Sequence, residues 1–312
     1  MKAMRFHEYG EPGVLRLEDV DEPAPGPGEA RVRVAATSFN PVDAGIRGGF
    51  LQEVFPLALP HVPGIDVAGT VDALGAEVTD LRVGDAVVGS LPLVADGASA
   101  EYVLAPAELL AGAPATIPLA DAAAVPTVGL TAWQALFEHT GVRAGQRVLV
   151  NGAGGAVGGY AVQLAKRAGA EVVATASPRS AERVQATGAD QIIDHTATSV
   201  ADAVTAPVDV AHNHAPVAPH QLAALAALIR PGGVVLSTTT PAPAGDGRGV
   251  RAVDVSLHSD AGQLATLVSM VDAGELRVDV GERLPLAQLP AVHARAVAGG
   301  LPGKIVLLSP AA

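Results

Sequence analysis

The chain has 312 residues, of which 49% are hydrophobic, and it carries a formal net charge of −12. This length accommodates two compact domains with buried cores. The excess of acidic residues disfavours a nucleic-acid partner. No apolar run approaches the roughly 20 residues of a membrane span, which disfavours a membrane partner. The chain has no cysteine, which excludes disulfides, thiolate nucleophiles, iron–sulfur clusters and cysteine-ligated zinc. With no apolar signal core at residues 1–10, we expect a cytoplasmic protein.

Residues 1–120 are predicted to form a mostly β domain. Short extended runs alternate there with turns rich in Pro, Gly and Asp. The extended runs are 15–20, 30–37, 67–71, 86–88 and 101–104.

Residues 121–262 change to an alternation of strands and helices. Ala-rich segments with helical spacing separate the predicted strands, which is typical of a parallel sheet covered on both faces. The predicted strands are 148–150, 172–175, 191–193, 209–211, 234–237 and 250–253. We therefore predict a doubly wound Rossmann sheet, and an α/β fold class for the chain.

The last segment, 263–312, is expected to complete the first domain. Helical patterns cover 261–273 and 287–299, and an apolar run follows at 304–308. This last run is expected to return to the first domain as a strand.

The stretch "NGAGGAVGG", residues 151–159, directly follows the predicted strand 148–150. A dinucleotide site needs a strand, small residues where backbone amides approach the pyrophosphate, and a helix N-terminus facing the negative charge. The G-x-G-x-x-G pattern appears with alanine at its first position, and the following helix is amphipathic. We predict a cofactor cradle rather than a structural turn. Its residues are Gly152, Ala153, Gly154, Gly155, Ala156, Val157 and Gly158.

The choice between NAD and NADPH depends on the end of the second strand. An acidic residue there would bind the ribose 2′-OH of NAD, but the stretch reads "ATASPRSAER" and Glu182 comes only in the next helix. Ser177, Arg179 and Arg183 offer a hydroxyl and two guanidinium groups suited to a 2′-phosphate. NADPH is the predicted cofactor; the alternative is that both arginines are solvated helix charges.

Several segments along the chain share the pattern of one family. They are "MKAMRFHEYGEPGVLRLEDV", "TSFNPVDAGIRGG", "PHVPGIDVAGTVDALGAEVTDLRVGDAVVG", "AAAVPTVGLTAWQAL", "VLVNGAGGAVGGYAVQLAK" and "GKIVLL". Together they resemble the medium-chain dehydrogenase/reductase superfamily, and within it the zinc-free quinone oxidoreductase (zeta-crystallin-like) branch. The resemblance implies a GroES-like catalytic domain, a Rossmann domain that binds NADPH, and a homodimer. It also implies reduction of a quinone or of the C=C bond of an α,β-unsaturated carbonyl.

The positions that match the zinc ligands of the superfamily hold Asn40, Ile65 and Thr127. An amide, an alkyl group and a hydroxyl do not replace two thiolates and an imidazole around zinc, so no metal is expected. By resemblance, Asn40 and Thr127 are expected to line the nicotinamide or its ribose. The alternative for both is local capping of loop backbone.

Two stretches depart from the family pattern. Where quinone reductases of this branch often carry a tyrosine, this chain has Gly45, which suggests a roomier pocket. Asp43 and Arg47 are candidate catalytic residues beside it; the alternative is that they form a structural ion pair.

The second departure is "VAHNHAPVAPH", residues 210–220. Asn213 and His214 stand where relatives place an acidic and hydroxyl pair beside the cofactor, and we expect His214 to contact the cofactor or to donate a proton near pH 7. A metal pair with His212 would need a third ligand, which the sequence does not offer. His195, near the adenine half by resemblance, and Thr238, after the strand 234–237, complete the predicted cofactor-binding set.

The predicted function is therefore a zinc-independent, NADPH-dependent oxidoreductase acting on a small-molecule electron acceptor, a quinone or an enone. Two alternatives stay open at this point. One is a tailoring ene reductase that acts on a carrier-bound or polycyclic intermediate, and the other is an NADPH-binding sensor or structural protein with little turnover.

Overall fold

The computed structural model describes residues 1–243, 247–255 and 257–311. The chain divides into two compact units. Unit 1 comprises Met1–Thr127 and Ser259–Ala312, and unit 2 comprises Val128–His258. The sequence had placed these divisions at 120/121 and 262/263.

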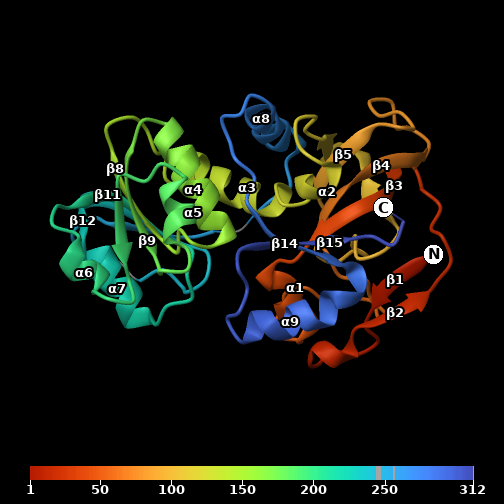
Figure 1. The fold of residues 1–312 in the computed structure, drawn as a ribbon, viewed down its shortest axis with the longest axis horizontal. Coiled ribbons are helices and arrows are strands. Elements are labelled where there is room, and N and C mark those ends of the chain that lie inside the picture. The colour runs from red at the N-terminus through yellow and green to blue at the C-terminus, as the bar shows by residue number, and fades with distance from the viewer. Residues whose placement is uncertain (244–246, 256, 312) are drawn as a thin grey trace. The chain divides into compact units, whose positions relative to one another are not determined.

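Unit 1 is built on a mainly antiparallel sheet with the strand order β14-β15-β3-β4-β5-β7, and β6 also pairs with β3 (Figure 1). Its strands are β1 (Lys2–Arg5), β2 (Arg16–Asp19), β3 (Glu29–Ser38), β4 (Asp66–Leu74), β5 (Ala86–Ser90), β6 (Tyr102–Pro106), β7 (Leu110–Gly112), β14 (Val280–Pro285) and β15 (Lys304–Leu308). Its helices are α1 (Pro41–Arg47), α2 (Leu119–Ala122), α8 (Ala261–Asp272) and α9 (Leu289–Val297). The alternating apolar residues of β3 and β4, such as Val32 and Val71, form the core of the sheet.

The last strand, β15, does return to the sheet of unit 1, as predicted from its apolar run. It pairs antiparallel with β3, so that Val306 lies opposite Ser38. The apolar side chains Ile305 and Leu307 pack in one cluster with Ile46 of α1 and Leu289 of α9. This pairing is what places the first residue of β15 beside the end of β3.

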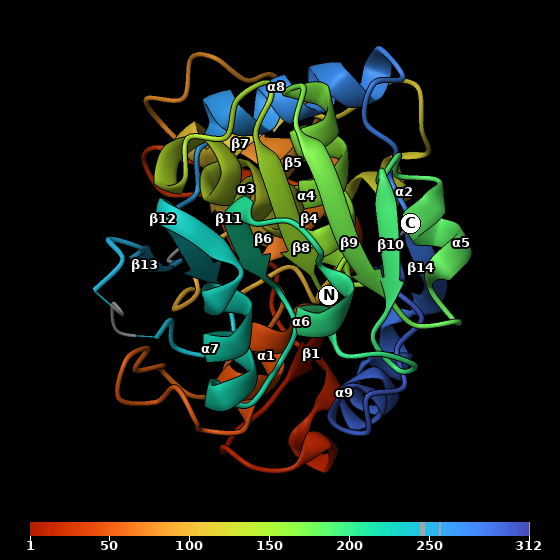
Figure 2. The same ribbon diagram turned by 90° about the vertical axis from the view of Figure 1, so that its left-hand side faces the viewer.

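Unit 2 contains a parallel sheet with the order β10-β9-β8-β11-β12-β13 (Figure 2). Its strands are β8 (Arg147–Asn151), β9 (Glu171–Ala176), β10 (Gln191–Asp194), β11 (Val208–Asn213), β12 (Ile229–Ser237) and β13 (Arg251–Asp254). Its helices are α4 (Ala156–Arg167), α5 (Ala181–Gln185), α6 (Val200–Ala203) and α7 (Pro219–Ala227). α3 (Pro126–Trp133) begins in unit 1 and continues into unit 2, where a π-helical turn, Gln134–His139, follows it.

Helices cover both faces of this sheet, which is the doubly wound arrangement. α4 and α5 pack on one face, while α6 and α7 lie over the other (Figures 1 and 2). The predicted α/β fold class is confirmed. The helix face that α4 buries includes Ala161 and Leu164 as expected, whereas Val157 and Ala168 at its ends are only partly buried.

Across the described ranges, no helix is both long and apolar enough to cross a membrane.

Candidate functional site

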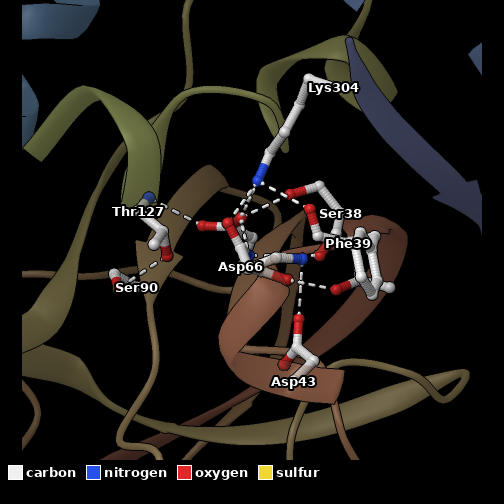
Figure 3. Close-up of polar contacts among 9 residues, drawn as sticks. Ser38, Phe39, Asp43, Asp66, Ser90, Thr127 and Lys304 are labelled. Atoms are coloured by element: carbon white, nitrogen blue, oxygen red, sulfur yellow. Dashed lines mark hydrogen bonds and ion pairs between the residues drawn. The ribbon is translucent and has the colours of Figure 1, made fainter. Parts of the chain in front are cut away.

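A buried polar cluster lies where β3, β4 and α1 meet in unit 1 (Figure 3). Its centre is the carboxylate of Asp66, the first residue of β4, which is 0% exposed. Four groups donate to this carboxylate: Thr127 N at 2.8 Å, Asn40 Nδ2 at 2.8 Å, Lys304 Nζ at 3.1 Å and the hydroxyl of Ser38. A buried charge is tolerated when it is paired and fully hydrogen-bonded, and Asp66 meets both conditions.

Lys304, the first residue of β15, supplies the positive charge of this cluster. Its ammonium donates to Phe39 O at 3.1 Å, to Asn40 Oδ1 at 2.5 Å and to Asp66 Oδ2 at 3.1 Å. These three acceptors match the three protons of the ammonium group. Since the Lys304 and Asp66 side chains are only 3% and 0% exposed, this ion pair is screened very little by solvent.

Two of the predicted active-site residues of unit 1, Asn40 and Thr127, belong to the cluster. Asn40 immediately precedes α1 and uses its amide oxygen for Lys304 and its amide nitrogen for Asp66, which fixes the orientation of the amide. Thr127 is the second residue of α3; its backbone N–H donates to Asp66, and its hydroxyl lies 3.2 Å from Ser90 Oγ. The Asn40 side chain therefore makes long-range contacts rather than only capping the local loop.

Sequence reasoning missed Asp66, Lys304 and Ser90. The available signal was a charged residue directly beside a position that matches a zinc ligand, in "GIDVAG", and a lone lysine at the head of the apolar run "KIVLL". Charged residues are almost never fully buried unless they are paired.

Asp43 and Arg47 are both buried on α1 but do not pair with each other, so the predicted structural ion pair is wrong. Asp43 accepts from Asn40 N at 2.9 Å. Arg47 donates instead to Gly10 O and, at 3.3 Å, to Nδ1 of His293. Burial lowers the pKa of His293 to about 3, with a further contribution from the nearby Arg47 charge, so the neutral ring can accept this bond.

Burial also raises the pKa of Asp43 to about 7, and the neighbouring Asp66 carboxylate contributes to this rise. The backbone amides of Asn40 and Gly64 and the Lys304 charge act in the opposite direction. Asp43 therefore holds a proton near neutral pH, as a catalytic acid or base must.

The substitution Asp43→Asn should stabilise the protein, and more so at pH 8 than at pH 5. Because the folded pKa is raised above the unfolded value, the stability contributed by Asp43 is full below pH 3.8 and is lost as the pH rises through about 7. The Asn variant does not titrate, so its advantage should grow by about 2–3 kcal/mol between pH 5 and pH 8. Urea unfolding of both proteins at the two pH values measures this difference; an advantage that is constant with pH would contradict the raised pKa.

The space beside Gly45 is partly filled. A Cβ atom at Gly45 would lie 3.2 Å from Cδ1 of Leu51, which comes from the segment that follows α1. Leu51 therefore lies directly beside the position of a Cβ at Gly45, and the roomier pocket stays a prediction.

The glycine loop of unit 2 joins β8 to α4 in the strand–loop–helix arrangement that was predicted. Gly152 has a φ of +87°, and a Cβ there would lie 2.9 Å from Ala215 N; Gly158 has no room because a Cβ would overlap Gly152 O. Gly155 is the N-cap of α4, so the amides of Ala156 and Val157 lie in the first turn, where helical N–H groups have no intrahelical acceptor. This close-packed loop before a helix N-terminus fits the pyrophosphate of a dinucleotide.

Polar residues occupy the carboxyl-terminal positions of the central strands of the same sheet. Asn213 at the end of β11 stands in register with Asn151 of β8 and Ser237 of β12. Asn151 Nδ2 donates to Asn213 Oδ1 at 2.8 Å, and Asn213 Nδ2 lies 3.0 Å from Ser237 Oγ. Thr175 of β9 extends this series of hydrogen bonds. Its hydroxyl donates to Asn151 Oδ1 and accepts from Gly152 N, both at 2.9 Å.

These hydrogen bonds connect the glycine loop to the predicted residue Asn213. Sequence reasoning missed its other members, although polar residues at the carboxyl ends of successive parallel strands are the available signal for such a site.

His214 follows β11 and is held by its neighbours. Its backbone N donates to Asn151 O at 2.8 Å, and its Nδ1 lies 3.2 Å from the hydroxyl of Thr238. Burial lowers the pKa of His214 to about 4, so the ring is neutral near pH 7. The expectation that His214 donates a proton near pH 7 is therefore not supported. Its Nε2 is buried and has no hydrogen-bond partner among the residues that the structure describes, so it is free to contact a ligand.

His212 lies on β11 itself and is 0% exposed. Its Nε2 lies 3.1 Å from the Thr140 hydroxyl, and its ring packs edge-on against that of His214, with the centroids 5.7 Å apart. Within the described residues, no group of three or more His, Cys, Asp or Glu side chains could hold a metal ion.

The residues predicted for a 2′-phosphate follow β9. Arg183 of α5 donates through Nη2 to Gly154 O at 2.8 Å, which places its guanidinium against the glycine loop. Ser177 lies in the turn before α5, and its Oγ is 3.4 Å from Ser180 Oγ. Arg179 is exposed in the same turn, and His195 is exposed directly after β10, with its backbone N bonded to Ala176 O. No carboxylate stands at the end of β9, where Ala176 is the last residue.

The donors present in unit 1 do not fit the zinc site of the zinc-containing dehydrogenases. Asn40 Oδ1 already accepts from the Lys304 ammonium, and a cation bound there would meet that positive charge. Ile65 has no donor atom in its side chain, and the chain has no cysteine.

Two family models match the chain. Residues 26–115 match the alcohol dehydrogenase GroES-like domain, and residues 187–307 match a family described as zinc-binding dehydrogenase. The second description does not agree with the donor set just described.

Among curated proteins, the chain is 40% identical over 202 residues to the chloroplast envelope quinone oxidoreductase homolog of Arabidopsis thaliana, covering 62% of this chain and 61% of that protein. The chain thus matches about three fifths of the length of the first such relatives. Among solved structures, it is similar to the quinone oxidoreductase from Coxiella burnetii, with 29% identity and a TM-score of 0.88 over 99% of both chains. A mycobacterial protein solved in complex with NADPH gives 31% identity and a TM-score of 0.86, also over 99% of both chains.

The GroES-like sheet of unit 1 and the Rossmann sheet of unit 2 define the class of dinucleotide-dependent dehydrogenases and reductases. More specifically, the chain belongs to the medium-chain dehydrogenase/reductase superfamily, in its quinone oxidoreductase branch.

Proposed function

We propose that this chain is a zinc-independent, NADPH-dependent oxidoreductase that reduces a quinone or the C=C bond of an α,β-unsaturated carbonyl. The observation that carries the proposal is the glycine loop, whose positions 152, 154 and 158 have no room for a side chain and which leads into the N-terminus of α4. The names of relatives, which describe quinone oxidoreductases and an NADPH complex, support the same function.

The cofactor would be held by residues of unit 2. The first turn of α4, with Ala156 and Val157, would face the pyrophosphate. The buried Nε2 of His214, which has no partner within the described part of the chain, would be a polar contact. Arg183, with Ser177 and Arg179 in the turn before α5, would bind the 2′-phosphate. When bound, the nicotinamide supplies the hydride.

Residues of unit 1 would donate a hydrogen bond and a proton to the electron acceptor. The hydroxyl of Thr127 would donate to the oxygen on which negative charge develops, since a fixed donor at that atom stabilises the transition state. Asp43 is proposed to supply the proton, because its pKa of about 7 allows it to hold and release a proton near neutral pH.

A panel of acceptors tests this function. Oxidation of NADPH, followed at 340 nm, should occur with benzoquinones, naphthoquinones or simple enones. Turnover of an enoyl thioester alone would favour the tailoring reductase, and tight NADPH binding without turnover on any acceptor would favour a sensor or structural protein. Either result would contradict the proposed function.

Arg183→Ala should weaken the binding of NADPH by about 10-fold to 100-fold, because a charge-assisted bond to phosphate contributes about 1.5–3 kcal/mol. The affinity for NADH should change much less, since NADH has no 2′-phosphate. Arg143→Ala, which removes an exposed arginine from the loop before β8, provides a control with the same change of charge. Calorimetric titration of both cofactors measures the effect; equal losses for NADPH and NADH would argue against a 2′-phosphate contact.

A cytoplasmic location and a homodimer belong to the same proposal. The name of the Arabidopsis thaliana relative places that protein at the chloroplast envelope. Light scattering of the purified chain would test the dimer: a single species with twice the mass of 31.2 kDa is expected, and a monomer at all concentrations would exclude it.

A further inference from the structure

The buried ion pair between Lys304 and Asp66 joins segments that are far apart in the sequence. Lys304 begins β15, Asp66 begins β4, Asn40 precedes α1 and Thr127 lies in the first turn of α3. All four side chains are buried, and each of the other three residues is hydrogen-bonded to Asp66 (Figure 3).

The bonds of this cluster leave Asn40 a single orientation. Its amide oxygen faces the Lys304 ammonium, while its amide nitrogen faces the Asp66 carboxylate. If the ammonium were removed, the amide oxygen and the Phe39 carbonyl would lose their donor, and a buried carboxylate would lose its counter-charge.

The same carboxylate fixes Thr127. Oδ1 of Asp66 accepts from the backbone N–H of Thr127, which holds the first turn of α3 and so positions the Thr127 hydroxyl near Ser90. The four donors on Asp66 are divided between its two oxygens, so a rotation of the carboxylate would break the bond to Thr127 and those to Asn40 and Lys304 together.

We propose that Lys304 is the positioning residue of this site: its ammonium orients the Asn40 amide and holds the Asp66 carboxylate, which in turn fixes Thr127 for reaction with the acceptor. The proposal rests on the proposed function, because it assigns Lys304 a role in that reaction. Lys304 acts through its neighbours and, with all three protons engaged, makes no direct contact with the acceptor.

Lys304 also influences Asp43. The Lys304 charge lowers the pKa of Asp43, whereas burial and Asp66 raise it. The charged and titratable groups that face Asp43 are Asp66 of β4, Lys304 of β15 and His61, which lines a small cavity together with Asp43. The loss of the ammonium should therefore move the titration of Asp43 to higher pH, an effect that a loss of packing alone would not produce.

The first test is Lys304→Met, which keeps a linear side chain as far as Cε and removes the ammonium group with its charge. We expect kcat with the best quinone or enone acceptor to fall at least about 100-fold, as small displacements of reacting groups commonly cause. The dissociation constant for NADPH should stay within twofold, because the glycine loop belongs to unit 2. Lys2→Met is the matched control: it removes an ammonium paired with Asp19 on the surface of the same unit, and it should leave kcat unchanged.

The second test is chemical rescue, which the chain permits because it has no cysteine. Lys304→Cys should be as impaired as Lys304→Met. Alkylation of this unique thiol with 2-bromoethylamine in the unfolded chain, followed by refolding, creates an ammonium of nearly lysine length and should restore at least one tenth of the original kcat. Alkylation with iodoacetamide adds a neutral group of similar size and should restore none.

A folded Lys304→Met protein with kcat within threefold of the original would overturn the proposal, and so would equal rescue by both reagents. If Lys304→Met does not fold, the pair Asp66→Asn with Lys304→Met removes both charges and is measured in its place, with the same expected loss of kcat and the same overturning result.

The titration of Asp43 separates this proposal from the proposed function. ¹³C NMR of protein labelled at aspartate carboxyl groups, assigned with Asp43→Asn, follows Asp43 without turnover. If the unmodified chain reduces no acceptor, the proposed function fails, yet an upward shift of the Asp43 titration in Lys304→Met would still support the electrostatic link. An unchanged titration would count against that link even if the chain is an active reductase.

Discussion

Gly158→Ala is expected to abolish tight NADPH binding, with a loss of at least about 100-fold in affinity, equivalent to about 2.8 kcal/mol. A Cβ at this position would overlap Gly152 O and lie 2.7 Å from Cα of Ala153, so the loop has to move away from the N-terminus of α4. The overlap should also cost about 1–3 kcal/mol of folding free energy.

Gly159→Ala provides the matched control for this prediction. It lies one residue further along α4, where a Cβ would have its nearest neighbour, Ala153 O, at 3.9 Å. Both substitutions give the same gain in helix propensity, about 0.5–1 kcal/mol, so the difference between the two variants isolates the overlap with the loop.

Calorimetric titration with NADPH and urea unfolding measure the two effects. If Gly158→Ala binds NADPH as tightly as Gly159→Ala does, the loop is not the cradle that we describe.

Asp66→Ala is expected to lower the free energy of unfolding by about 3–5 kcal/mol, because it leaves the Lys304 ammonium buried without its counter-charge. It also removes the acceptor of Thr127 N and of Asn40 Nδ2. In the double variant Asp66→Ala with Lys304→Met, the total loss should be smaller than the sum of the two single losses, since neither partner is then left as an uncompensated charge.

Asp19→Ala is the control for this cycle, because Asp19 forms an ion pair with Lys2 in which its side chain is 78% exposed. This variant should unfold at the same urea concentration as the original chain. Additive losses for Asp66 and Lys304 would show that the two residues do not act as a pair.

The architecture could be predicted from the sequence because its periodic signals are strong. The run 304–308 coincides with β15, and the predicted strand 148–150 lies within β8, Arg147–Asn151. In both segments, continuous apolar residues are followed or preceded by turn residues, so local pattern and tertiary position agree.

The polar site could be predicted only in part. Asn40 and Thr127 were found because they match positions of a known family, but their common partner was not. Asp66 and Lys304 are 238 residues apart, and no local pattern indicates that one meets the other. Their contact depends on the pairing of β15 with β3, which is a property of the folded sheet.

The pKa of His214 and the hydrogen-bond partners of Arg47 also could not be predicted from the sequence. His214 was expected to titrate near pH 7, whereas its burial lowers its pKa to about 4. Arg47 was expected beside Asp43, yet it reaches Gly10 and His293 of α9. The direction of a long side chain and its degree of burial are set by packing against distant elements.

The most direct test of the account is a single-turnover reaction without metal. The purified chain, dialysed against a strong chelator and shown by mass spectrometry to hold no zinc, is mixed with NADPH and then with excess 1,4-naphthoquinone. We predict that the absorbance at 340 nm decays in one turnover at the same rate as for protein that was not treated with chelator. If the treated protein loses this reaction and added Zn²⁺ restores it, the central claim of a zinc-independent, NADPH-dependent reductase is wrong.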